Sequence, residues 1–415
     1  MIEYLSKEFI IIDNDGEKGL KRILTITPYT IGDTHALGIT MEKFFHNCDI
    51  SNIYQLYFYE ENKARKRYDN EYCYNYFWYI NRNKENKQAS TKNIIMPVKA
   101  RFTARLRTSI KEMLPVVIPA SLLKRIDLFE PEVIYVQLYG MQMIKLVEKI
   151  RKRYQIPLVV HMMDDWIETA KENRVFEALY ERQVKRMLRS LLRKSTYVYG
   201  AAPAMCDYLL KEYGADAEFV MPYTEFPQDC PVYKSNSSII RFAYTGNIEG
   251  GRHSVIIMLL NALDNLGVEY HLDVYTRQEE YLSNYRNEHL TVHGAVPQRE
   301  VESILDSADG LIHVESFDED KIKWAKYSLS TKIPEYLASG RPIFYLGPEE
   351  VGVGDFLNRG FAECDENASR LALRIREFYK QNDELIYEIT KKRFNRAKKI
   401  LSEKEMGNNF SRWYV

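Results

Sequence analysis

The sequence predicts an α/β protein of two domains, each an open, doubly wound sheet, that face each other across a cleft. Short apolar runs alternate with helical patterns along most of the 415 residues, which is typical of parallel sheets with helices on both faces. A segment rich in Pro, Ser and Asn, from about 222 to 238, interrupts this alternation, which then begins again. A chain of this length can bury two separate cores. We therefore expect a first domain over residues 1–226 and a second over residues 238–390.

The first domain shows this alternation in four apolar runs and two helical segments. The runs predict strands at residues 22–27, 133–138, 156–161 and 197–200. Helices are expected at about 35–45, after a turn-rich loop, and at 141–154, where basic residues mark the solvent side. Between about 60 and 100 the pattern gives way to Tyr-, Asn- and Lys-rich sequence. This segment indicates an insertion that leaves the sheet, or a long loop with an aromatic-anchored helix.

The second domain repeats the pattern. Strands are predicted at residues 239–245, 270–275, 290–293, 310–314 and 343–346. Helices are predicted at 253–266 and 301–307, and residues 368–401 are helical again. In open α/β sheets a ligand binds beyond the carboxyl ends of the strands. Two such sheets joined by one linker therefore predict a ligand-binding cleft between the domains.

Composition narrows the classes of partner. The formal net charge is zero, so nothing indicates a polycation that binds nucleic acid. Residues 1–225 carry 34 Lys and Arg against 29 Asp and Glu, while the remainder carries 24 against 29. The small basic excess of the first half fits an anionic or membrane-borne partner.

The expected location is the cytoplasm, either free or at the inner face of the cell membrane. The five cysteines are scattered and show no metal-ligand spacing, which favours a reducing compartment. The N-terminus lacks the apolar core of a signal peptide. The longest apolar stretch, residues 113–123, is too short to span a bilayer and contains Pro115 and Pro119.

Residues 328–347 have the pattern of a helix start that binds an anion. Ser330 and Thr331 are expected to cap a helix, whose free amide groups and dipole attract negative charge. Glu335 follows Thr331 by four residues and so lies on the same side of the helix, which is expected to end at Gly340. A diphosphate over the helix start and a sugar hydroxyl on Glu335 suit a nucleotide-sugar site. An ordinary capped helix with a surface Glu has the same pattern.

Four segments carry a resemblance to a known family. They are Tyr244-Thr-Gly-Asn, Val292-His-Gly-Ala-Val-Pro, Ser307-Ala-Asp-Gly-Leu-Ile and Lys332-Ile-Pro-Glu-Tyr-Leu-Ala-Ser-Gly-Arg-Pro. In this order and spacing, the chain resembles the GT-B fold glycosyltransferases, in particular the retaining family-4 type of bacterial surface-glycan synthesis. The resemblance is strongest over about residues 238–350 and is absent from the Tyr-rich insertion.

The resemblance implies a fold and a reaction. Two Rossmann-like domains would face a cleft, and the C-terminal segment 391–415 would cross back to pack on the first domain. The reaction would move a sugar, with retention, from a UDP-, GDP- or dTDP-sugar to the hydroxyl of a glycan, lipid-linked or protein-linked acceptor, with no cofactor and no metal. A nucleotide-sugar 2-epimerase and a non-catalytic GT-B subunit that holds a partner are alternatives with the same fold.

The resemblance also assigns residues to the donor diphosphate. Gly246, followed by Asn247, matches a glycine that lets the backbone approach the phosphates, although a simple tight turn would use the same two residues. Arg252 is expected to clamp the phosphates with its planar guanidinium, and Lys332 to add positive charge.

The other donor contacts are expected on the same domain. Ser330 and Thr331 lie where amide groups of the family meet the diphosphate. Glu335 matches the acidic residue that binds the ribose hydroxyls, and Val296 lies where the base is recognised through backbone groups. A second Glu of the family pattern, which contacts the donor sugar, is replaced here by Tyr327, so the identity of the sugar stays open.

The first domain is expected to supply the other side of the site. His161 ends a predicted strand and matches the family's active-site His near the donor sugar, although a His held by local hydrogen bonds would fit the same position. Asp164 and Asp165 are interpreted as caps of a helix that begins near Trp166, and not as metal ligands. Acceptor contacts are expected from one loop, at Gly32, Asp33 and His35.

A further predicted helix carries a basic face. Its cationic residues follow helical spacing and are Arg182, Lys185, Arg186, Arg189 and Arg193. Such a helix could rest on anionic lipid and bring the protein to a lipid-linked acceptor. A solvated basic face on an ordinary core-packing helix has the same pattern.

Overall fold

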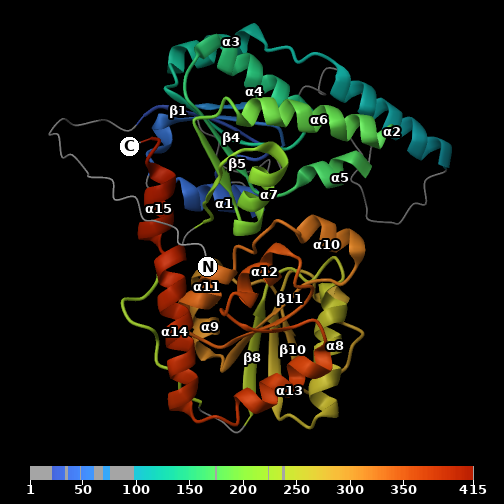
Figure 1. Ribbon diagram of the computed structural model, residues 1–415, viewed down its shortest axis with the longest axis vertical. Helices are drawn as coiled ribbons and strands as arrows, with labels where there is room; N and C mark the ends of the chain where they lie inside the picture. The colour runs from blue at the N-terminus through green and yellow to red at the C-terminus, as the bar shows by residue number, and fades with distance from the viewer. Residues whose placement is uncertain are drawn as a thin grey trace, which may run out of the picture.

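The protein folds into two α/β domains, which lie one above the other in Figure 1. The computed structural model describes residues 21–32, 36–46, 48–59, 69–74, 98–172, 175–222, 224–235 and 239–414. Each domain contains one parallel sheet with helices on both of its faces. The predicted fold class, two Rossmann-like doubly wound domains, is confirmed. Each predicted strand is present, within two residues at either end.

The first sheet has seven parallel strands in the order β3-β2-β1-β4-β5-β6-β7. Their bounds are β1 Ile23–Thr27, β2 Ile53–Tyr57, β3 Glu71–Cys73, β4 Val133–Gln137, β5 Leu158–Met162, β6 Tyr197–Gly200 and β7 Glu218–Phe219. Every residue of β1, β2, β4 and β5 is buried, because helices cover both faces of the sheet. The strand β2 was not predicted, because Gln55 interrupts its apolar run. In the fold, the Gln55 side-chain oxygen accepts a hydrogen bond from the Ile31 amide at 2.9 Å.

The helices of the first domain fill the connections between these strands. They are α1 Ala36–Phe44, α2 Val98–Met113, α3 Ala120–Phe129, α4 Met141–Tyr154, α5 Trp166–Glu172, α6 Glu177–Leu192 and α7 Pro203–Tyr213, with a 3-10 turn η1 at Ile50–Asn52. In Figure 1, α2, α3, α4 and α6 lie along the upper side of the domain, and α1 and α7 lie nearer the second domain. Most of the predicted Tyr-rich insertion lies outside the described residues. Its described parts form β3 and the first turn of α2.

The second sheet has six parallel strands in the order β10-β9-β8-β11-β12-β13. Their bounds are β8 Ile240–Thr245, β9 Tyr270–Tyr275, β10 Leu290–His293, β11 Gly310–Val314, β12 Ile343–Leu346 and β13 Glu363–Asp365. The surrounding helices are α8 Arg252–Asn265, η2 Glu279–Tyr281, α9 Gln298–Ser307, α10 Glu319–Ala325, α11 Ile333–Ala338, α12 Gly352–Asn358 and α13 Ala368–Phe378. The order of strands reverses between β1 and β4 in the first sheet and between β8 and β11 in the second, and such reversals open crevices for ligands. Among the described residues, no helix is long and apolar enough to cross a membrane.

The chain ends against the first domain after leaving the second. Helices α14 (Asp383–Leu401) and α15 (Glu403–Ser411) run in sequence along one side of the molecule, from the second domain to the first (Figure 1). Phe410 contacts the Tyr135 ring edge-on at 5.5 Å, and Trp413 stacks parallel to Tyr135 at 5.6 Å. Phe410, Trp413 and Tyr414 are each less than 5% exposed. The last residues therefore complete the core of a domain that begins nearly 400 residues earlier.

We expect Phe410→Ala to lower the free energy of unfolding by about 3–5 kcal/mol, because it empties a fully buried aromatic site. Urea denaturation followed by circular dichroism measures this change. The matched control is Leu385→Ala on α14, where the side chain is 49% exposed and a change within about 0.5 kcal/mol is expected. Equal losses in the two variants would show that the C-terminal aromatic residues do not support the first domain.

Candidate functional site

The carboxyl ends of both sheets open onto one pocket between the domains. The pocket has a volume of about 750 Å³. The first domain contributes Tyr139 after β4 and Asp164 after β5. The second domain contributes Arg252 at the start of α8, Glu315 after β11 and Lys332 before α11. This is the position in which open α/β sheets bind ligands.

The ammonium group of Lys332 lies directly against the backbone of Gly246. A Cβ atom added to Gly246 would be 1.7 Å from the Lys332 Nζ atom, so a side chain here would displace the ammonium group. The φ angle of Gly246 is 142°, a value that residues with a side chain rarely adopt. Among the described residues, no acceptor lies within hydrogen-bonding distance of this ammonium group. Burial lowers the pKa of Lys332 to about 8, although nearby carboxylates act against this shift. Among the described residues, the Lys332 ammonium therefore has carboxylates nearby but no hydrogen-bonded anionic partner.

Arg252 is held by a carboxylate that the sequence did not identify. Its Nε and Nη2 atoms donate to Glu315 Oε2 at 3.0 and 2.8 Å. Burial alone would raise the pKa of Glu315, but His313 and Arg252 outweigh it and hold that pKa below its usual range. The position of Glu315 directly after the buried strand β11 was the available signal, because side chains at that end face the cleft. An anion that binds Arg252 must therefore share it with Glu315.

The loop before α11 lines the pocket but does not cap the helix as predicted. Ser330 and Thr331 both line the pocket. The helix begins later than expected, at Ile333, with Lys332 at the N-cap and no side-chain capping bond. The Lys332 amide donates to Ser330 Oγ at 3.5 Å, a long contact. Pro334 explains the late start, since proline favours the first turn of a helix and needs no amide partner there.

Two predicted donor residues lie apart from the pocket lining. Glu335 accepts a hydrogen bond from the Lys43 ammonium at 2.8 Å, and this ion pair joins α11 to α1 of the first domain. Val296 follows β10 and packs against the hydrophobic core. Asn247 does line the pocket, but its side chain is bonded within its own loop, where its Oδ1 accepts from the Glu249 amide at 2.6 Å.

His161 does not reach the cleft. Its side chain is fully buried, and Nε2 donates to the Val220 carbonyl at 2.9 Å. Nδ1 then accepts from the Tyr135 hydroxyl at 2.8 Å, so both ring nitrogens have partners inside the domain. Burial lowers the pKa of His161 to about 4, which keeps the ring neutral among Phe44 and Phe410. The expectation that His161 approaches a bound sugar is therefore corrected: it is a core residue held by local hydrogen bonds.

Asp164 takes the place in the cleft that was expected for His161. Asp165 is buried and accepts a long hydrogen bond from the Ile167 amide at 3.3 Å, as a helix cap does, and burial raises its pKa to about 6. Asp164 instead accepts a hydrogen bond from Ser328 Oγ at 2.5 Å. This bond crosses between the domains. Surrounding protein raises the pKa of Asp164, although the carboxylate is accessible from the cleft.

Tyr327 forms another contact between the domains. Its ring stacks on that of Tyr208 from α7, with the centroids 4.2 Å apart and the planes 17° from parallel. It is absent from the described pocket lining. The position where the family pattern has a sugar-binding Glu is thus used here for an aromatic contact with the first domain.

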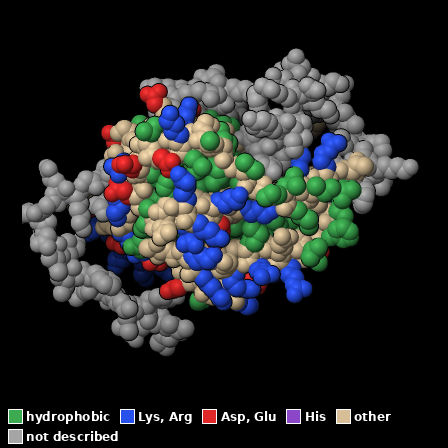
Figure 2. Space-filling view, turned by 90° about the horizontal axis from the view of Figure 1, so that it is seen from above, with side chains coloured by type: hydrophobic (Ala, Val, Ile, Leu, Met, Phe, Trp, Pro, Cys, Tyr) green, Lys and Arg blue, Asp and Glu red, His purple; other side chains and the backbone are tan. Residues whose placement is uncertain are grey.

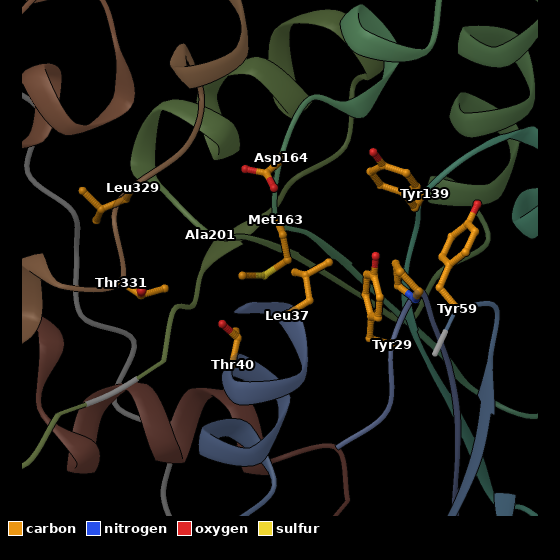
Figure 3. Close-up of a pocket in the computed structure, with 11 residues that line it drawn as sticks. Tyr29, Leu37, Thr40, Tyr59, Tyr139, Met163, Asp164, Ala201, Leu329 and Thr331 are labelled. Carbon is orange, nitrogen blue, oxygen red and sulfur yellow. The ribbon is translucent and has the colours of Figure 1, made fainter. Parts of the chain in front are cut away.

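A second pocket of about 440 Å³ adjoins the first on the side of the first domain (Figure 3). The predicted acceptor loop is described only in part. Gly32 is exposed, with a φ angle of 78°, and Asp33 and His35 lie outside the described residues. Neighbours of that loop, Tyr29 and Leu37, line the second pocket.

We expect Gly246→Ala to weaken the binding of inorganic pyrophosphate by about 10- to 100-fold, because the new methyl group must displace the Lys332 ammonium. Isothermal titration calorimetry measures the affinity. Gly267→Ala is the matched control, since Gly267 also has a positive φ angle, 60°, but open space around it. It should lower stability and leave pyrophosphate affinity unchanged. A normal affinity in Gly246→Ala would contradict the assignment of Lys332 to an anion.

Comparison with known proteins finds structures with a similar fold. No protein-family model matches the chain, and no curated protein is similar to it in sequence. A sucrose-phosphate synthase from Thermosynechococcus elongatus aligns over 95% of this chain and 98% of its own, with a TM-score of 0.62 and 11% identity. HepE from Anabaena, solved in complex with UDP, aligns over 94% and 98%, with a TM-score of 0.60 and 10% identity.

A third similar structure is the lipopolysaccharide outer core galactosyltransferase WaaB in its apo form. It aligns over 93% of this chain and 98% of its own, with a TM-score of 0.51 and 12% identity. Each alignment spans both domains and nearly all of the matched protein. The two parallel sheets, their facing carboxyl ends and these similarities show that the chain has the GT-B fold of glycosyltransferases.

Proposed function

We propose that the protein is a glycosyltransferase, which moves a sugar from a nucleoside diphosphate sugar to an acceptor hydroxyl. The observation that carries this proposal is the Lys332 ammonium, which lies against Gly246 in the pocket between the domains and has no hydrogen-bonded anionic partner among the described residues. Arg252 lies in the same pocket. A diphosphate would satisfy both cations, and its departure from the sugar is the charge-generating step of such a transfer.

The leaving diphosphate is the group that this site is built to stabilise. Lys332 supplies a point charge, and Arg252 supplies a planar fork of donors that it shares with Glu315. These groups are in place before the reaction, so no reorganisation is needed as negative charge develops. Because the two cations can carry that charge, we propose that transfer is independent of metal and other cofactors. Ser330 and Thr331 add polar groups to the same wall.

The nucleoside is assigned to the second domain. We propose that Glu335 exchanges its ion pair with Lys43 for hydrogen bonds to the ribose hydroxyls, and that the loop of Val296 contacts the base. The Lys43–Glu335 pair joins the domains, so donor binding is coupled to their relative position. HepE was solved with UDP and with UDP-glucose, which makes UDP the first nucleotide to test.

The setting of the reaction is bacterial surface glycan or polysaccharide synthesis, in the cytoplasm, with retention at the anomeric carbon. The second pocket beside the donor site favours transfer to a separate acceptor over a 2-epimerase, which needs no such space. NMR of the donor incubated alone separates the two, because an epimerase would convert the sugar without an acceptor. For a non-catalytic subunit, Glu335→Ala would leave donor affinity unchanged.

We expect Arg252→Ala to weaken UDP binding by about 10- to 100-fold and uridine binding by no more than about twofold, since Arg252 faces the phosphates. Calorimetric titration of UDP, GDP and dTDP, each beside its nucleoside, measures both effects. The double variant Arg252→Ala/Glu315→Gln should recover part of the UDP affinity, because it removes the carboxylate left without its partner. Equal losses for UDP and uridine would contradict the role of Arg252. Binding of none of the three diphosphates would contradict the proposed function.

We also propose that one face of the first domain rests on an anionic membrane. The predicted basic helix α6 contributes less free charge than its sequence suggests, because Lys185 pairs with Glu181 and lies near Glu212. The neighbouring helix α2 adds an apolar stripe of exposed side chains, Leu106, Ile110 and Met113. Figure 2 shows hydrophobic side chains gathered beside Lys and Arg on this upper face. Apolar and basic residues together are what an interfacial helix presents to lipid.

Replacing Ile110 by Asp should reduce co-sedimentation with phosphatidylglycerol vesicles by about tenfold or more. The Ile110 side chain, which is 53% exposed, would enter the lipid interface, and a charged carboxylate in its place would oppose this insertion. Leu373→Asp on α13 of the second domain is the control, with a similar exposure of 43%. Membrane binding that is unchanged in Ile110→Asp would exclude this face as the contact.

A further inference from the structure

The second pocket meets the donor pocket at a single junction. Tyr139, Asp164, Leu329 and Thr331 line both pockets. A sugar that passes from donor to acceptor must cross this junction. The atoms that react are therefore expected next to these four residues, of which only Asp164 carries a formal charge.

Aromatic surface dominates the second pocket. Tyr29, Tyr59 and Tyr139 lie on one side of it, and Leu329 and Thr331 lie on the opposite side, with Asp164, Met163 and Leu37 between them (Figure 3). Tyr59 is 46% exposed and Tyr139 is 48% exposed, so both rings are accessible to a ligand. The rings present flat apolar faces, and their hydroxyl groups can exchange hydrogen bonds with a ligand.

The charge of the pocket limits what it can hold. Among its described lining residues there is no Lys, Arg or His. Asp164 contributes the negative charge there, and a phosphate or carboxylate placed beside it would be repelled, with no cation among these described lining residues to compensate. The cationic side chains that line the donor pocket, Arg252, Lys321 and Lys332, are absent from the described lining of the second pocket.

Asp164 is held in a defined orientation at the junction. Ser328 of the second domain donates to its Oδ1 at 2.5 Å. A carboxylate accepts several hydrogen bonds, so the remaining lone pairs can accept from a ligand hydroxyl. Because the donor of this bond belongs to the other domain, the carboxylate is positioned when the two domains are together.

We propose that the second pocket takes an uncharged sugar ring of the acceptor, which stacks on the tyrosines and donates its reacting hydroxyl to Asp164. This assignment rests on the proposed function. The hydroxyl oxygen forms the new bond to the anomeric carbon as the bond from that carbon to the diphosphate oxygen breaks. The electron pair leaves with the diphosphate. As the new bond forms, the single hydroxyl proton turns from its hydrogen bond with Asp164 to a phosphate oxygen of that leaving group. Asp164 orients the hydroxyl and stays ionised.

Binding of simple glycosides tests this pocket without any turnover. The probes are methyl glucoside, methyl galactoside and methyl mannoside, set against glucose 6-phosphate, methyl glucuronide and n-octanol. Saturation-transfer NMR and calorimetry are carried out on the full chain, with and without saturating UDP. We expect at least one neutral glycoside to bind, and to bind more tightly than either anionic sugar or the alkyl alcohol.

Two variants test whether the neutral glycoside binds in the second pocket. Tyr139→Ala should weaken binding of the neutral glycoside by about 3- to 10-fold through loss of stacking. Asp164→Asn should weaken it by about tenfold or more through loss of a charge-assisted hydrogen bond. Asp216→Asn is the control, since Asp216 is exposed before β7, at the far end of the sheet from the cleft.

The outcomes distinguish failure of the pocket assignment from failure of the proposed function. Preferred binding of an anionic sugar or of octanol, or glycoside binding unchanged in Tyr139→Ala and Asp164→Asn, would overturn the pocket assignment even if UDP binds normally. UDP binding with no neutral glycoside bound would overturn it as well. Glycoside binding that is lost in both variants, in a protein that binds no nucleotide, would support the pocket and contradict the proposed function.

Discussion

The cleft depends on one close approach, the Lys332 ammonium against the backbone of Gly246. This contact needs the glycine at the end of β8 and the loop before α11 in adjacent positions, which the pairing of β11 between β8 and β12 provides. An ammonium group in such surroundings loses hydration, and its pKa falls to about 8 as a result. In the proposed function, a bound anion would offset that cost; groups with displaced pKa values often gather at functional sites.

The domains are joined around this cation by contacts of different chemistry. Lys43 and Glu335 form an ion pair, Asp164 and Ser328 form a hydrogen bond, and Tyr327 stacks on a tyrosine of α7. The C-terminal helices add a continuous link, since they leave the second domain and end in the core of the first. Residues on both sides of the cleft are therefore held next to one another by the fold itself. At Tyr327, where the sequence resemblance would place a Glu, this chain has an aromatic contact that joins the domains.

The sequence predicted the fold more completely than the site. Buried parallel strands are continuous apolar runs, so β1 and β8 were visible, while β2 was hidden by Gln55, whose partner Ile31 is distant in sequence. Motif spacing located Gly246 and Lys332 because both lie on one domain, close to its strand ends. His161 was expected at the cleft but lies in the core, and Asp164, three residues later and beyond the end of β5, lines the cleft instead. Contacts across the domains, such as Lys43 with Glu335, have no local signal.

The most direct test of the central contact is the number of protons taken up when UDP binds at pH 9. The free Lys332 side chain, with a pKa of about 8, is mostly neutral at that pH, and a bound diphosphate favours its charged form. Calorimetry in buffers of different ionisation enthalpy should give close to one proton per site, and almost none in Lys332→Arg, which stays charged. UDP binding at pH 9 without proton uptake, or with equal uptake in Lys332→Arg, would contradict the account.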